Sequence, residues 1–319
     1  MLALGAEGEY LSAFPAVLFL ALILAIIWGV RKLAPTANTF SVVIGLAVLL
    51  TAPIVIRSGL YINGHVLMAL AVTVASVLVI AAIRDSQLET KELITLMVSL
   101  SVISTTRAEG IAVAALIAIP LLASKWITRK QIMLIVSSAT LSASIWLAVY
   151  NSYILNSTGL PWPLFTIILV GLGLLVAIKP LDAIRHRAVW LAISAELAVI
   201  AVALVVFFDD LQNGISSQFE NIFLNQGLWG VTLIAAFASV AYLLIVSKEK
   251  SFGLLLVMLV LGQVILKMLD GGQFGEPTLG RVGWADSLNR MWLHVSGLFA
   301  LSFVLVLQKN KDEQTKAIL

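Results

Sequence analysis

Residues 93–123, LITLMVSLSVISTTRAEGIAVAALIAIPLLA, are the most informative part of the sequence for the fold. It holds two apolar pieces that are separated by the polar run Thr106-Arg107-Ala108-Glu109-Gly110. Two charges facing hydrocarbon would be costly, because lipid offers them neither water nor hydrogen-bond partners. We therefore expect a hairpin of two short helices whose turn reaches water or a polar cavity.

The chain around this hairpin is strongly apolar. Of its 319 residues, 61% are hydrophobic and 12% are charged, and the mean hydropathy is +1.05. An ordinary soluble protein has about 45–50% apolar and about 25% charged residues. So few polar side chains cannot cover a water-facing surface, which excludes a soluble enzyme and a disordered protein. The absence of cysteine excludes a disulfide-bonded domain, a thiolate metal site and a cysteine nucleophile.

Further apolar runs on both sides of the hairpin approach the ~20 residues that cross a bilayer. They fall at 13–30, 40–56, 61–83, 131–150, 163–178, 188–207, 228–246, 252–268 and 288–307. With the hairpin counted as two segments, the sequence predicts an all-α, polytopic membrane bundle of eleven segments. The expected organisation is an outer segment at 1–12, a transmembrane domain at 13–307 and a cytoplasmic tail at 308–319.

The basic residues predict the orientation of this bundle. Of the twenty, fifteen fall in alternate loops and the C-terminal tail, and alternation holds only if 93–123 crosses twice. Because cytoplasmic loops carry the basic excess, we expect the N-terminus outside the cytoplasmic membrane and the C-terminus inside. The net charge of +3 then reflects topology, and no nucleic-acid partner is expected. The five remaining basic residues fall outside: Arg57, Arg107, Lys267, Arg281 and Arg290.

The outer basic residues have no such topological role, so chemistry is expected at the outer face. At the hairpin break, Arg107 could hold a phosphate with its planar guanidinium, with Glu109 orienting it. The alternative is a turn in which the two charges are solvated or paired. The outer segment 208–227 could also contain a short helix lying on the membrane.

Two further outer clusters carry chemistry-bearing side chains. Asp286, Arg290 and His294 follow an i, i+4, i+8 spacing, which predicts one helical face able to orient and stabilise a phosphate. The alternative for Arg290 is an interfacial anchor. Arg57 and His65 flank the turn between two predicted spans, where His65 is either a helix cap or a catalytic group.

One acidic residue lies within a predicted span. Glu196 could belong to a proton-coupled transporter, or it could be protonated and hydrogen-bonded to another span through Gln263. No paired-histidine metal pattern is present, so we expect no metal site. No cofactor pattern is present either, and the sequence leaves the use of a divalent cation open.

Several of these motifs are similar to those of the C-type glycosyltransferases, multispan enzymes that take sugars from polyprenyl-phosphate carriers. TTRAEG resembles the family's T-K-x-E-G segment, and DSLNRMWLHVSGLF resembles its NR-x-x-x-H-x-x-P-L helix. LLTAPIVIRSGLYINGH resembles a T-x-P run that leads to an outer turn. Arg107 stands where the family commonly has Lys, and Gly297 stands where it usually has Pro.

The resemblance implies a transferase that uses a polyprenyl-phosphate-linked sugar and an acceptor glycan, lipid or protein. It implies an outer carboxylate as base, for which Glu7 and Glu9 are the candidates, because the family's first span and acidic loop have no counterpart here. The chain would then be an N-terminally incomplete or a degenerate member. Arg107, Arg290 and His294 would stabilise the departing lipid phosphate, with Arg107 and Arg290 converging on one site.

The sequence is compatible with three function classes. A lipid-linked sugar transferase comes first, and a polysaccharide polymerase or ligase would use the same outer arginines. A multispan transporter is the third, and a membrane partner subunit is compatible with each of them.

Overall fold

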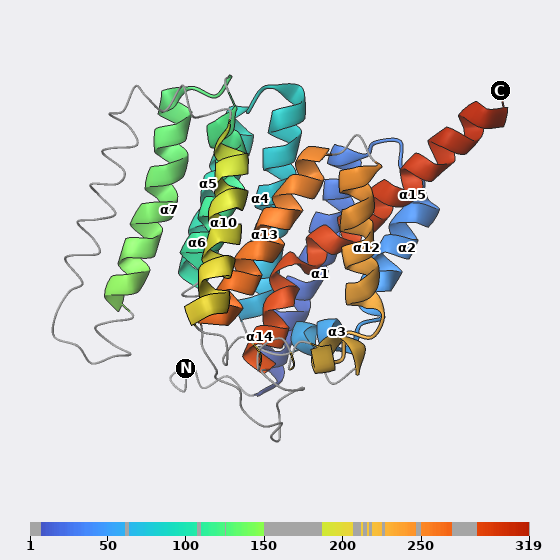
Figure 1. The fold of residues 1–319 in the computed structure, drawn as a ribbon, viewed down its shortest axis with the longest axis horizontal. Helices are drawn as coiled ribbons and strands as arrows, with labels where there is room; N and C mark the ends of the chain where they lie inside the picture. Colours follow the sequence, from blue (N-terminus) through green and yellow to red (C-terminus); the bar gives the residue numbers. More distant parts are fainter. Residues whose placement is uncertain are drawn as a thin grey trace. The chain divides into compact units, whose positions relative to one another are not determined.

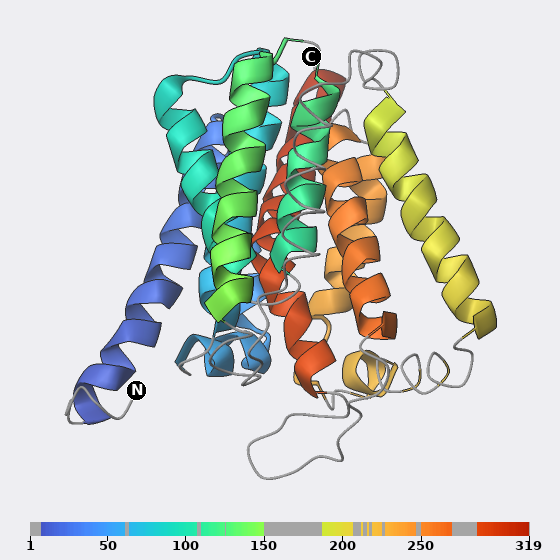
Figure 2. The same ribbon diagram turned by 90° about the vertical axis from the view of Figure 1, so that its left-hand side faces the viewer.

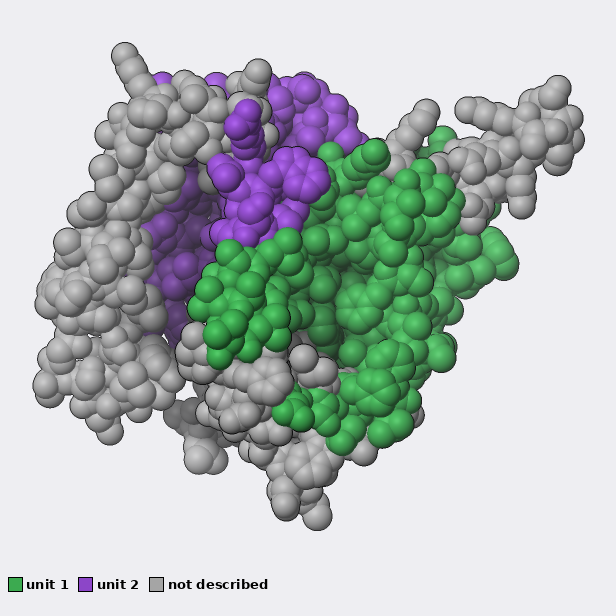
Figure 3. All heavy atoms as spheres, viewed as in Figure 1, with its two compact units in different colours: residues 1–73, 196–319 green, residues 74–195 purple. Residues whose placement is uncertain are grey.

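A computed structural model describes residues 8–60, 64–106, 110–124, 126–149, 187–206, 212, 216, 219–224, 227–246, 250–269 and 286–318. Every element of regular secondary structure in these ranges is a helix, which confirms the all-α prediction for this part of the chain. The chain divides into two compact units (Figure 3). Unit 1 comprises 1–73 and 196–319, and unit 2 comprises 74–195.

Unit 1 is a bundle of helices from both ends of the sequence. Its elements are α1 (Gly8–Leu33), α2 (Thr39–Leu50), α3 (Pro53–Leu60), α12 (Thr232–Ile245), α13 (Lys250–Leu269), α14 (Asp286–Met291), η4 (Trp292–Val295) and α15 (Ser296–Ile318). The helices α4 (Gly64–Asp85) and α10 (Ala188–Val206) are shared between the units. The start of α1, α3, α14 and the start of α12 lie at one end of unit 1 (Figures 1 and 2). These are the elements next to the segments that the sequence assigns to the outer side.

The apolar run 40–56 is two helices, which corrects the single span expected there. Helix α2 ends at Leu50, and the hydroxyl of Thr51 donates to the Val48 carbonyl at 2.7 Å. Proline has no N–H and favours the first helical position, so Pro53 starts α3. The N–H of Ile54 donates to the Leu228 carbonyl at 3.2 Å, which ties the new helix to the start of α12.

The apolar run 288–307 is also interrupted. Helix α14 ends at Met291, the 3-10 turn η4 follows, and α15 continues to Ile318, beyond the predicted start of the tail. At the other end of the chain, α1 begins at Gly8 and so includes part of the expected outer segment 1–12. The expected span at 163–178 lies outside the described residues.

Unit 2 contains the predicted hairpin. Helix α5 (Thr90–Thr106) packs against α6 (Gly110–Ala123) and against α7 (Arg129–Val149). The prediction of two helices within 93–123 is confirmed. A Cβ atom on Gly110 would collide with the carbonyl group of Ile103, so α6 begins at the one residue type that allows this approach. At ~1.5 Å per residue, 17 and 14 residues give helices of about 26 and 21 Å, shorter than the ~30 Å of hydrocarbon.

Three helices are long and apolar enough to cross a membrane: Phe14–Leu33, Gly64–Asp85 and Asn289–Gln308, the last counting α14 through α15 together. The second and third are mostly buried inside the protein, whereas two thirds of Phe14–Leu33 is not. Within unit 1, α4 and α15 approach closely at Gly297. A Cβ atom on Gly297 would collide with the Thr73 hydroxyl, because backbone and side chain are in direct contact there.

Candidate functional site: a buried histidine pair

The centre of the candidate site is a contact between two histidines of unit 1. Nδ1 of His65 and Nε2 of His294 lie 2.9 Å apart, and the rings stack with centroids 5.0 Å apart. Both side chains are buried, with exposed fractions of 3% and 0%. The two residues are 229 positions apart in the sequence. The pair is therefore formed by tertiary packing, which brings together two residues that the sequence analysis proposed separately.

Two helix starts position the rings. His65 is the second residue of α4, and His294 lies in η4 just before α15. Gly297 lies one turn beyond His294, and its backbone contacts Thr73 of α4. This close crossing of α15 and α4 brings the two imidazoles together. The contact lies at the end of the crossing where α4 begins and α14 ends.

The predicted face of Asp286, Arg290 and His294 needs correction. A 3-10 turn advances about 120° per residue against about 100° in an α-helix. Because the α-helix ends at Met291, His294 does not continue the face that carries Arg290. The break turns His294 toward His65, a partner that the i, i+4, i+8 spacing does not reveal.

The 2.9 Å contact limits how the pair holds protons. A neutral imidazole has one N–H donor and one acceptor, and a protonated imidazole has two donors. One ring must accept at this contact, so the pair in this geometry carries at most one extra proton. The proton can be held on either facing nitrogen. Imidazole is the side chain most often used for proton transfer near neutral pH, so this hydrogen-bonded pair is the candidate proton-transfer group of the site.

More buried polar groups surround the α14–α15 break. Nδ2 of Asn289 donates to the Gly227 carbonyl at 3.0 Å, and Asn289 is fully buried. A Cβ atom on Gly227 would lie 2.5 Å from Oδ1 of Asn289, so glycine is required there. Oδ1 of Asn289 and the Ser296 hydroxyl have no hydrogen-bond partner among the described residues. The helix break thus gathers amide, hydroxyl and imidazole groups that the sequence analysis did not group together.

The two described outer arginines lie near this end of unit 1. Arg57 is in the last turn of α3 and Arg290 is in the last turn of α14. Both residues are half-buried. Figures 1 and 2 show α3 and α14 at the same end of the unit.

The other proposed site residues are described less fully. Glu7, Arg107 and Glu109 lie outside the described residues, so the convergence of Arg107 and Arg290 stays a prediction. Glu9 and Asp286 belong to α1 and α14, but their side chains are outside the described part.

The described residues of TTRAEG have structural roles. The hydroxyl of Thr105 donates to the Ser101 carbonyl at 2.9 Å, and that of Thr106 donates to the Val102 carbonyl at 2.5 Å. These bonds stay within the last turns of α5. Together with the tight packing of Gly110, they fix where α5 ends and where α6 begins.

The proposed bond between Glu196 and Gln263 is not formed. Both side chains are buried, and neither the Glu196 carboxyl oxygens nor the Gln263 amide atoms have a partner within the described ranges. Over the same ranges, no three His, Asp or Glu side chains gather as a metal site would require.

Comparison with protein-family models, curated proteins and solved structures finds no match to this chain. The resemblance to C-type glycosyltransferases therefore stays a prediction that rests on short motifs.

Proposed function

We propose that this protein is a membrane transferase that moves a sugar from a polyprenyl-phosphate carrier to an acceptor at the outer membrane face. The observation that supports this most is the buried hydrogen bond between His65 and His294, at the end of unit 1 that also holds α3 and α14. This end of the unit combines a hydrogen-bonded imidazole pair with two helices that each carry one arginine, and both features suit a phosphate leaving group.

The chemistry assigned to the site conserves atoms and charge. The acceptor hydroxyl attacks the anomeric carbon, the bond from that carbon to the phosphate oxygen breaks, and polyprenyl phosphate leaves with the electron pair. The hydroxyl proton passes to the imidazole pair or to an outer carboxylate, for which Glu7 and Glu9 remain the candidates. Arg57 and Arg290 stabilise the charge on the departing phosphate.

The same proposal includes the membrane topology. The chain crosses the cytoplasmic membrane with eleven segments, the N-terminus lies outside, and the C-terminus lies inside. Support comes from the three long apolar helices, the α5–α6 hairpin and the charge alternation of the loops. A polysaccharide polymerase or ligase would use the same outer groups and differs only in its acceptor.

One observation favours a second class, a proton-coupled transporter. Glu196 and Gln263 are buried polar groups without partners in the described part of the chain, as expected along a proton path. Glu196→Gln separates the two classes. A transporter would lose proton uptake into vesicles, whereas a transferase would keep its affinity for a lipid phosphate.

The experiment that tests the transferase proposal is binding of farnesyl phosphate, a short polyprenyl monophosphate, to the purified full chain in detergent. Arg57→Gln and Arg290→Gln each remove a charged contact worth about 1.5–3 kcal/mol. The affinity should therefore fall roughly tenfold to a hundredfold, because each 1.4 kcal/mol is about a factor of ten. Lys250→Gln is the matched control, since Lys250 is exposed at the start of α13, at the opposite end of unit 1.

Farnesol, which lacks the phosphate, should bind equally weakly to the original protein and to all three variants. Farnesyl phosphate that binds no better than farnesol would contradict the proposal. Equal losses in Lys250→Gln and Arg290→Gln would contradict the location of the site.

A further inference from the structure

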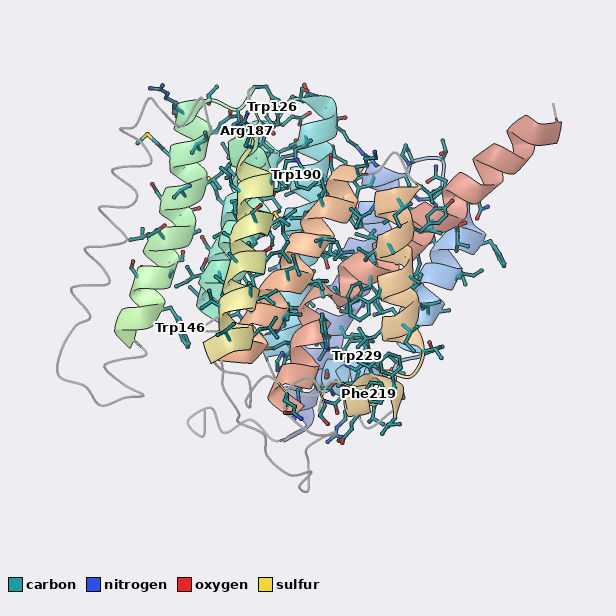
Figure 4. The ribbon with its side chains drawn as sticks, viewed as in Figure 1. Trp126, Trp146, Arg187, Trp190, Phe219 and Trp229 are labelled. Carbon is teal, nitrogen blue, oxygen red and sulfur yellow. The ribbon has the colours of Figure 1, made fainter. Side chains whose placement is uncertain are left out.

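The helical turn 219–223 carries two exposed phenylalanines outside the predicted spans. Phe219 and Phe223 are 53% and 57% exposed, and Leu224 is 60% exposed. The phenyl rings contact one another, with centroids 4.8 Å apart. In the view of Figure 4, Phe219 lies at the end of unit 1, beyond Trp229. A cluster of this size facing water would be unfavourable, which makes it a candidate contact surface.

The opposite side of the turn is held firmly by the protein. Asn221 is fully buried, and its carbonyl accepts from the Gly227 N–H at 3.1 Å. The Gly227 carbonyl in turn accepts from Asn289 of α14 at 3.0 Å. The phenyl rings are therefore exposed by a turn that is anchored at its back, and their orientation is part of the fold.

The exposed surface continues into the apolar face of the bundle. Val231, just before α12, is 75% exposed, and Ile234 in its first turn is 43% exposed. In a membrane-crossing helix, such residues face lipid. The turn 219–223 thus precedes an apolar helix whose first residues are exposed, and aromatic side chains beside such an apolar surface favour the membrane interface.

We propose that Phe219, Phe223 and Leu224 insert into the outer boundary between lipid headgroups and acyl chains, so that this turn lies in the plane of the membrane beside the candidate site. The partner is the lipid surface itself. The contact is apolar, because Glu220 on the same turn and Asp209 and Asp210 in the same outer segment give no attraction to anionic headgroups.

The experiment uses single cysteines, since the chain has none of its own. Phe219→Cys and Phe223→Cys carry a nitroxide label in phosphatidylcholine vesicles, and collision with oxygen and with a water-soluble nickel chelate gives the depth of each label. Both labels should lie about 5–10 Å below the headgroup surface, protected from nickel. Adding phosphatidylglycerol should leave these depths unchanged.

Three matched controls calibrate the measurement. Lys250→Cys is exposed at a polar helix end and should be accessible to nickel, and Leu24→Cys, exposed in the middle of α1, should be deepest. Glu220→Cys, on the same turn, should be shallower than its neighbours. Retained helical circular dichroism shows that each variant folds.

Nickel accessibility at 219 and 223 equal to that at 250 would overturn the proposal. So would spectral broadening that disappears when labelled protein is diluted with unlabelled protein, because the rings would then contact a second copy. Insertion that requires phosphatidylglycerol would overturn the apolar basis of the contact.

Discussion

Among single residues, the main prediction concerns the contact between His65 and His294. A buried imidazole that loses its partner keeps the cost of leaving water without the hydrogen bond, about 1–3 kcal/mol. The contact also joins α4 to the start of α15, two of the most buried parts of unit 1. Removing either ring therefore affects stability as well as chemistry.

We predict that His65→Ala and His294→Ala each lower the free energy of unfolding by about 1–3 kcal/mol. The double variant should cost less than the sum of the two by about 0.5–3 kcal/mol, because no orphaned ring remains. Reversible unfolding of the full chain in mixed micelles measures all three values. Strictly additive losses would mean that the two rings do not interact.

At the scale of elements, the approach of α15 to α4 depends on Gly297. A methyl group there collides with Thr73, so Gly297→Ala should destabilise the protein by about 1–3 kcal/mol and separate the histidines. Thr73→Ala removes the hydroxyl and should restore most of the loss in the double variant. Thermal unfolding in detergent compares the variants.

Gly253→Ala is the control for this prediction. The nearest atom to its added methyl would be Cδ2 of Leu244, at 2.9 Å, which is the flexible end of a side chain, so a smaller loss is expected. If Thr73→Ala gave no recovery in the Gly297→Ala background, the close contact would not be the cause of the loss.

The α5–α6 hairpin provides a second prediction at this scale. Gly110→Ala places a methyl group against the Ile103 carbonyl, which belongs to backbone and cannot rotate away. We expect a loss of about 3 kcal/mol, at the upper end of overpacking costs. The control Ala112→Gly, at an exposed position of α6, should cost about 1 kcal/mol from helix propensity alone. A Gly110→Ala protein as stable as this control would contradict the tight hairpin.

At the scale of the whole molecule, the orientation in the membrane is the main prediction. Cysteines introduced at Ser157 and Thr315 should react with an impermeant thiol reagent from opposite sides of the membrane, Ser157 from outside and Thr315 from the cytoplasm. The absence of native cysteine makes the labelling specific. Reversed labelling would move α3, α14 and the histidine pair to the cytoplasmic face and remove the basis for an outer active site.

Much of the fold is predictable from local sequence. Helices are required wherever apolar residues leave the backbone no water to bond with, and an α-helix satisfies its hydrogen bonds within one segment. The hairpin at 93–123 follows from the same rule, because the charges at 107 and 109 interrupt the apolar run. The break before Pro53 could have been predicted from the proline itself. The high average hydropathy of 40–56 favours a single span there and hides this break.

The candidate site could not be predicted in the same way, because its main contact joins residues 229 positions apart. His65 could be found from its place at a predicted helix start, and His294 from its spacing to Arg290. Arg57 and Arg290 could be found from the charge count. Their pairing could not, because it depends on the 3-10 turn that redirects His294 and on the close packing of Gly297 against Thr73. Local sequence predicts most of the described helices, because the hydrogen bonds of a helix form within one segment, but it did not predict the breaks after Leu50 and Met291. Which polar groups meet depends on how separate helices pack, so the contact of His65 with His294 appears only in the folded structure.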